Sequence, residues 1–303
     1  MKVLITGATG LVGQPLLQAL IQKNHSVHYL TTRKGQTQAL SGATGFYWNP
    51  EKEQIDIECF DGVDCVIHLA GASISQRWTK KNKANILDSR VKSTQLLYQA
   101  IKNLGEKNTI KHFISASAIG LYPSSDRRVY TEAYIGKPNS FLEKVCLAWE
   151  KEADALSTLG LMVSKIRIGL VLTPKGGVLG PMKISTSLGL GASFGSGKQV
   201  QSWIHIDDLV QMFMTVMEKQ WEGVYNGVSP NPVPQKVFAK SLAQVLRRPF
   251  FLPPVPAIFI RAIAGEMSVL VFNSQNVSAQ KVMDKGFLFR YPNLKEAMKS
   301  LLN

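Results

Sequence analysis

The chain's clearest chemical signal is three glycines near its start, Gly7, Gly10 and Gly13. They follow a strand-length apolar run at residues 3–5 and precede apolar residues at helical spacing. A strand that turns through glycines into a helix presents free backbone N–H groups and the positive end of the helix dipole, so it can bind an anion. Gly7 would allow the sharp turn, Gly10 the approach of a pyrophosphate, and Gly13 close packing of helix on strand.

This turn is predicted to hold the pyrophosphate of a dinucleotide cofactor. Its spacing is GxxGxxG rather than GxGxxG, and it joins a strand to a helix. A tight turn without a ligand is the alternative. The predicted cofactor contacts in the turn are Gly7, Thr9, Gly10, Leu11, Val12 and Gly13.

The second predicted strand, residues 26–31, ends in basic residues and carries no carboxylate. An acidic residue about 20 positions past the glycine turn holds the ribose 2′-OH of NAD, whereas arginine there accommodates the 2′-phosphate of NADP. Arg33 can bind a phosphate through two hydrogen bonds, and Lys34 adds a second positive charge. The sequence therefore predicts NADP(H) over NAD(H); the alternative is that both residues are solvated loop cations.

Two later strands are predicted to reach the same edge of the sheet. One ends in the small residues Leu69, Ala70 and Gly71, where Gly71 would let the backbone approach the cofactor. Residues 111–122 form the next strand and its exit, and Ser115 is a predicted cofactor contact. Ligands of open α/β sheets bind at the carboxyl ends of the strands, so we expect both exits to line one site.

Four residues are predicted to meet the substrate. Arg77 and Arg90 could bind a phosphate or carboxylate, or could be solvated cations. Trp203 could stack on a planar or sugar ligand, and His205 could act as a base. The alternative for Trp203 and His205 is a structural role in ordering the substrate loop.

The elements that must position these residues alternate between strands and helices over the first half of the 303-residue chain. This alternation predicts an α/β fold with a Rossmann-type doubly wound parallel sheet. Beyond Thr173 the sequence becomes glycine-rich and irregular, and residues 248–256 form a proline-rich linker. We expect a Rossmann domain over residues 1–248, with substrate-loop insertions after residue 173, and a small, mainly helical C-terminal lobe over residues 249–303.

Composition limits the classes of partner. The formal net charge of +14 favours anionic ligands, but the basic residues are scattered, so we expect a small-molecule substrate and no nucleic acid. The three cysteines show no metal-binding spacing and suit a reducing compartment as small core residues. No signal sequence or membrane-length apolar run appears, which predicts a cytoplasmic protein without a membrane partner. A monomer and a homodimer, formed through helices near residues 85–102 and 145–156, are both open.

A set of short motifs in one order over the whole chain extends the glycine signal. They are Thr6–Gly13, Leu69–Ala72, Arg77–Thr79, Ser89-Arg90, Ser115–Gly120, Phe141-Leu142, Trp149-Glu150, Arg167–Gly169, Gly176-Gly177, Ser202–Asp208 and Gly286-Phe287. Together they resemble the atypical extended short-chain dehydrogenases/reductases described as predicted nucleoside-diphosphate-sugar epimerases. The stretch from about Pro249 resembles the C-terminal domain of unknown function of that group. The resemblance implies a Rossmann domain with a small C-terminal lobe and an NADP(H) cofactor, but no particular substrate.

The catalytic pair of typical relatives is missing from this chain. They carry Tyr-x-x-x-Lys, in which the tyrosine is the acid/base and the lysine lowers its pKa; the corresponding positions here hold Leu142 and Cys146. One explanation is that Tyr122 supplies the acid/base group with Ser117, at the typical catalytic serine position, as its hydroxyl partner. This predicts an oxidoreductase or sugar-nucleotide epimerase acting on a small polar substrate. The alternative is a catalytically silent NADPH-sensing regulatory or binding module.

Overall fold

The computed structural model describes residues 1–302 and is built on one eight-stranded sheet. Its strand order is β12-β8-β6-β5-β1-β2-β3-β4, and neighbouring strands are parallel except for β3 and β4. The strands are β1 (Lys2–Thr6), β2 (Ser26–Thr31), β3 (Ala43–Asn49), β4 (Gln54–Ile55), β5 (Cys65–His68), β6 (His112–Ala118), β8 (Met162–Ile168) and β12 (Gly223–Gly227). The predicted doubly wound parallel sheet is confirmed.

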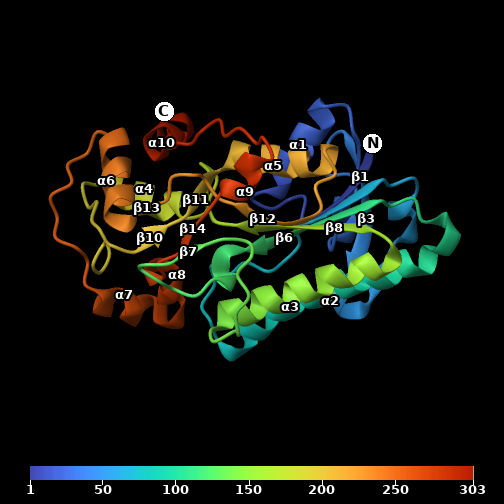
Figure 1. Cartoon of the computed structure of the whole chain (residues 1–303), viewed down its shortest axis with the longest axis horizontal. Helices are drawn as coiled ribbons and strands as arrows, with labels where there is room; N and C mark the ends of the chain where they lie inside the picture. The colour runs from blue at the N-terminus through green and yellow to red at the C-terminus, as the bar shows by residue number, and fades with distance from the viewer. Residues whose placement is uncertain (303) are drawn as a thin grey trace.

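Helices cover both faces of this sheet (Figure 1). On one face lie α1 (Gly13–Gln22) and α5 (Ile206–Glu218), and on the other lie α2 (Lys80–Leu104) and α3 (Phe141–Ala155). Strands covered on both faces are largely apolar, and Val3, Leu4 and Ile5 of β1 are indeed fully buried. The order of connections reverses between β1 and β5, so the carboxyl ends of these two strands and β2 open onto a crevice.

Local sequence signals determine where the long helices begin. The Thr79 hydroxyl caps α2 by accepting a hydrogen bond from the N–H of Asn82 at 3.2 Å. Ser140 and Glu143 form a capping box at the start of α3, in which the Glu143 carboxylate accepts a hydrogen bond from the N–H of Asn139. The cap of α3 sets the register that buries Cys146 and Glu150, four residues apart.

A second lobe, formed by the helices named below, lies at the opposite end of the molecule from the N-terminus (Figure 1). Its core packs Leu172 and Phe238 against Met298, so it combines residues from before and after position 249. Its helices are α4 (Leu179–Ser187), α6 (Gln235–Val245), α7 (Ala257–Ala264), α8 (Val269–Phe272) and α10 (Leu294–Leu302), whereas α9 (Gln280–Asp284) packs on the main sheet beside β12. Three short strand pairs lie outside the main sheet: β9 (Leu170–Leu172) with β11 (Trp203–His205), β10 (Val200–Gln201) with β13 (Val233–Pro234), and β7 (Val129–Tyr130) with β14 (Asn276–Val277).

Two further expectations from the sequence concern the cysteines and the membrane-spanning potential of the helices. Cys59, Cys65 and Cys146 are free and buried, which confirms that they are core residues. Over residues 1–302, the helices are all too short or too polar to cross a membrane.

Candidate functional site

The glycine turn forms as its sequence predicts. Gly7 follows β1 with φ +70°, a left-handed conformation that favours glycine, and its carbonyl accepts a hydrogen bond from the N–H of Gly10 at 2.9 Å. A Cβ added to Gly13 would lie 2.1 Å from the Gly7 carbonyl oxygen, so only glycine fits there. Within residues 1–302, the N–H groups of Leu11, Val12 and Gly13 have no hydrogen-bond partner, and no side chain caps α1. The turn therefore offers unpaired donors to an anion.

A buried hydrogen-bond chain fixes the floor beside this turn. The Thr6 hydroxyl accepts hydrogen bonds from the N–H groups of Leu69 and Ala70, each at 3.1 Å, and lies 2.7 Å from Nδ1 of His68. The other ring nitrogen of His68 contacts the hydroxyl of Thr94 on α2. Burial lowers the pKa of His68 to about 3, so the ring is neutral and links β1, β5 and α2 without carrying charge.

A cleft of about 760 Å³ lies at the carboxyl ends of β1, β2 and β5. The predicted cofactor residues that line it are Gly7, Thr9, Arg33, Ala70 and Gly71. Arg33 is exposed at the rim, where the end of β2 contributes Thr31 and Thr32 rather than a carboxylate. The structure thus joins the glycine turn and the basic end of β2 in one concave site.

Other predicted cofactor contacts lie outside this cleft. Gly10 and Leu11 line a separate hollow of about 420 Å³ together with Lys175. Lys34 turns its ammonium over the ring of Tyr47, 5.1 Å from the centroid. The Ser115 side chain is buried and donates its hydroxyl hydrogen to the carbonyl of Ala116. Leu69, Val12 and Gly13 shape the turn and the floor rather than line the cleft.

One face of α2 and Gln36, after β2, also line the cleft, although the sequence did not predict them as cofactor contacts. Asp88, Ser89, Lys92 and Ser93 recur at a spacing of four residues, and Lys92 pairs with Asp88 at 3.0 Å. That polar i, i+4 repeat was the signal that could have identified this helix face. Lys175 was also missed, because nothing local marks a loop lysine that reaches the glycine turn.

A smaller cavity of about 180 Å³ lies between α3, the end of β6 and the second lobe. Its wall includes Leu142 and Cys146, the positions of the missing catalytic pair, and Arg90 of α2. Burial raises the pKa of the Cys146 thiol to about 12, so that thiol stays protonated and unreactive. Of the predicted substrate residues, only Arg90 lines this cavity.

Tyr122 needs correction as a candidate acid/base group. Its side chain is 1% exposed, and its hydroxyl donates to the amide oxygen of Asn226 at 2.7 Å and accepts from Arg167 at 2.9 Å. Burial raises the pKa of Tyr122 to about 12. The hydroxyl lines neither the cleft nor the small cavity, so the structure gives it no access to a substrate.

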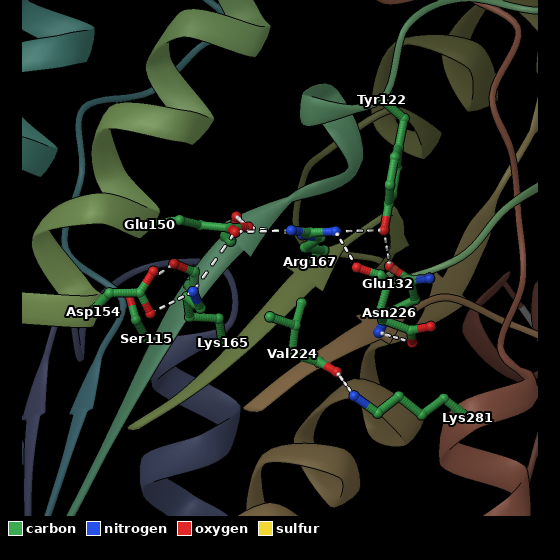
Figure 2. Close-up of polar contacts among 12 residues, drawn as sticks. Ser115, Tyr122, Glu132, Glu150, Asp154, Lys165, Arg167, Val224, Asn226 and Lys281 are labelled. Atoms are coloured by element: carbon green, nitrogen blue, oxygen red, sulfur yellow. Dashed lines mark hydrogen bonds and ion pairs between the residues drawn. The ribbon is translucent and has the colours of Figure 1, made fainter. Parts of the chain in front are cut away.

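Ser117 belongs to the same buried network, of which Figure 2 shows Glu150, Arg167 and Tyr122. Its hydroxyl donates to the Glu150 carboxylate at 2.6 Å, and Glu150 forms two hydrogen bonds with the Arg167 guanidinium. Although burial alone would raise the pKa of Glu150, these hydrogen bonds and the Arg167 charge hold it below its usual value. Both predicted catalytic hydroxyls are therefore engaged in holding β6, α3 and β8 together.

Trp203 and His205 are also structural in this geometry. Trp203 is fully buried and donates its ring N–H to the carbonyl of Asn231. The Nδ1 atom of His205 accepts the N–H of Asp207 at 3.0 Å and caps α5, while Nε2 contacts Ser300. Burial lowers the pKa of His205 to about 4. The geometry matches the ordering role that was the alternative to substrate contact. Arg77 is exposed and lines neither the cleft nor the small cavity.

Comparison with known proteins decides the family. A family model described as the NAD dependent epimerase/dehydratase family matches residues 3–227. The chain belongs to this epimerase/dehydratase family. Residues 255–301 match a second model, described as a domain of unknown function, so the predicted family membership is confirmed. An epimerase family protein of Staphylococcus saprophyticus is 38% identical over 301 residues, which cover 99% of each chain.

Solved structures of epimerase family proteins share the whole fold. A crystal structure of the human epimerase family protein SDR39U1 with NADPH has a TM-score of 0.85 and 27% identity, covering 99% of each chain. A nucleoside-diphosphate sugar epimerase from Corynebacterium glutamicum has a TM-score of 0.79 and 29% identity, covering all of this chain and 58% of that one. The structure of the human relative contains NADPH.

Proposed function

We propose that this epimerase family protein uses NADP(H) and that Arg33 selects it over NAD(H). The observation that carries this proposal is the position of Arg33 on the cleft, at the end of a strand that offers no carboxylate for a ribose 2′-OH. A guanidinium in that place matches a 2′-phosphate through two hydrogen bonds. The NADPH present in the structure of the human relative supports the same choice.

The chain offers a fitting donor for each charged part of the cofactor. The unpaired N–H groups of Leu11, Val12 and Gly13 would hold the pyrophosphate at the start of α1. Arg33 would hold the 2′-phosphate at the rim. When bound, NADPH supplies a hydride to an electrophilic carbon.

We further propose an oxidoreductase acting on a small molecule in the cavity beside Leu142 and Cys146. In this reduction the substrate's carbonyl carbon gains a hydride and its oxygen gains a proton. The described residues that line this cavity include no group that titrates near neutral pH, because burial holds Cys146 as a thiol and Arg90 is a permanent cation. We therefore propose that the solvent supplies the proton, either as hydronium or as water that leaves hydroxide behind. The volume of about 180 Å³ favours a small substrate over a nucleotide sugar, because sites for drug-sized ligands span about 300–1,000 Å³.

One observation favours a second candidate, a silent NADPH-sensing module. The acid/base positions hold Leu142 and Cys146, and the hydroxyls predicted to replace them, Ser117 and Tyr122, are engaged in the buried network. This candidate shares the cofactor but has no turnover.

The two candidates separate in one experiment on the full chain. NADPH is titrated by its fluorescence, and a panel of small aldehydes and ketones is then screened for loss of nicotinamide absorbance. Saturable NADPH binding with turnover of at least one carbonyl compound supports the oxidoreductase. Tight binding with no turnover over the panel supports the sensing module, and no NADPH binding would contradict both.

A further inference from the structure

The small cavity contains one charged side chain in an otherwise neutral wall. Its lining comprises apolar residues such as Ile74, Leu142 and Ile168, a few neutral amides and hydroxyls, and Arg90 as the single charged residue among the described residues. A lone cation in such surroundings determines the charge of the ligand that fits, because burying an unpaired charge is costly.

Arg90 is held in place by the loop after β5 and by the preceding turn of α2. Its Nη1 atom donates to the carbonyl oxygens of Ala72 at 3.1 Å and Ile86 at 2.9 Å. The guanidinium lies 5.0 Å from the ring centre of Trp149. It also lies against Gly71, where an added Cβ would approach the guanidinium carbon to 3.0 Å. These contacts fix the direction of the guanidinium before any ligand binds.

The edge of the guanidinium formed by Nε and Nη2 makes no hydrogen bond to the described residues. Within residues 1–302, neither Nε nor Nη2 of Arg90 donates a hydrogen bond, and neither atom is sealed in the core. The described residues place no carboxylate within ion-pair distance of Arg90. Its ionisable neighbours are the Cys146 thiol and the His68 ring, both of which are uncharged. Arg90 is thus a mostly buried cation that lacks a counter-ion and retains free donors.

We propose that Arg90 is the receptor for the carboxylate of a small oxo acid, the substrate class of the proposed oxidoreductase. The fork of Nε and Nη2 matches the two oxygens of a carboxylate. A phosphate dianion would need a second cation, and the described lining of the cavity supplies none. This inference rests on the proposed function only for the carbonyl group; the carboxylate follows from Arg90 itself.

A carboxylate bound to Arg90 would orient the rest of the substrate in the cavity. The same cavity wall carries Leu142 and Cys146, at the acid/base positions of typical relatives. An acid anchored on Arg90 would lie beside those positions with its remaining atoms against apolar side chains. The cavity volume of about 180 Å³ limits those atoms to a short chain or one ring.

The test measures binding of benzoate and of its neutral isostere benzamide by calorimetry, to the full chain with and without saturating NADPH. Benzoate is expected to bind at least ten-fold more tightly than benzamide. Arg90→Gln should abolish this preference, and Arg90→Lys should retain part of it, because lysine keeps the charge but not the planar fork. Lys102→Gln, an exposed charge change about 18 Å further along α2, should leave it unchanged.

The outcomes separate the two proposals. Equal binding of benzoate and benzamide, absence of saturable benzoate binding, or an unchanged preference in Arg90→Gln would overturn the carboxylate receptor. Thermal unfolding identifies a misfolded Arg90→Gln protein, in which case Arg90→Lys decides the question by weakening the preference or leaving it whole. If wild-type protein does not bind NADPH but still prefers benzoate to benzamide, the proposed cofactor is wrong and the proposed carboxylate receptor is retained.

Discussion

The carboxylate of Glu150 and the guanidinium of Arg167 form a buried bidentate ion pair, with Nε–Oε1 at 2.8 Å and Nη2–Oε2 at 2.9 Å. The pair joins α3 to β8, accepts a hydrogen bond from Ser117 through Glu150, and contacts Tyr122 through Arg167, as Figure 2 shows for Tyr122. Removing one member of a buried pair leaves the other charge uncompensated. The network therefore explains why two hydroxyls near the cofactor edge of the sheet serve stability rather than proton transfer.

The structural role of Tyr122 predicts a stability change without a binding change. Tyr122→Phe removes the hydroxyl that bonds Asn226 and Arg167, so the free energy of unfolding should fall by about 1–3 kcal/mol. NADPH affinity should stay the same. Tyr98→Phe is the control, because the Tyr98 hydroxyl makes one exposed bond to Thr158. Urea unfolding and NADPH titration of both variants test the prediction; unchanged stability with lost turnover in Tyr122→Phe would restore its catalytic role.

His205 should likewise affect stability alone. His205→Ala removes the cap of α5 and the contact with Ser300 on α10, which predicts a loss of about 0.5–2 kcal/mol in the free energy of unfolding. The ring lines neither the cleft nor the small cavity, so NADPH and benzoate affinities should match wild type. A selective loss of benzoate binding at unchanged stability would contradict this assignment.

The glycine turn gives a matched pair of substitutions. Gly13→Ala places a Cβ 2.1 Å from the Gly7 carbonyl oxygen, so it must displace the turn, lowering the melting temperature and weakening NADPH binding. Gly35→Ala meets no atom within 4 Å and has ordinary backbone geometry, so its stability should be unchanged or slightly raised. Thermal unfolding of the two proteins with and without NADPH compares them; equal behaviour would contradict the close packing at Gly13.

Buried neutral histidines predict acid sensitivity. Burial lowers the pKa of His68 to about 3 and those of His112 and His205 to about 4, below the unfolded value of about 6.5. Between these values the unfolded chain binds more protons, so the free energy of unfolding should fall as pH falls below about 6.5, by about 2 kcal/mol per histidine from pH 7 to pH 5.

His112→Gln isolates one of these contributions. Glutamine can still reach the Ser164 hydroxyl, which lies 2.6 Å from the histidine ring nitrogen, but does not titrate. The variant should lose about 2 kcal/mol less than wild type between pH 7 and pH 5 in denaturant unfolding. An equal loss in both proteins would show that His112 is not held neutral.

Local sequence was sufficient to predict the sheet and the glycine turn but not the roles of the Ser117 and Tyr122 hydroxyls. The turn at Gly7, Gly10 and Gly13 depends on neighbours in sequence, and so does the basic end of β2 at Arg33. The burial of Tyr122 depends on Asn226, 104 positions later, and on Arg167, 45 positions later. Such long-range partners leave no periodic signal, so a tyrosine after a central strand looks equally suited to catalysis and to packing.

The second lobe and the Arg90 cavity show the same limit. The proline-rich segment near residue 250 predicts a boundary, yet Phe238 and Met298 share one core across it. Arg90 was one of two equivalent arginine candidates in sequence. Only the fold separates them, because it exposes Arg77 and turns Arg90 into a cavity without a counter-ion.

The most direct test of the cofactor assignment is a parallel titration of wild-type protein, Arg33→Ala and Arg77→Ala with NADPH and NADH. Arg77→Ala removes an exposed arginine outside the cleft and controls for the loss of charge. Wild type and Arg77→Ala should prefer NADPH by at least about ten-fold, or ~1.4 kcal/mol, and Arg33→Ala should lose this preference while its NADH affinity is unchanged. Equal affinities in wild type, or a preference that survives Arg33→Ala, would contradict the assignment.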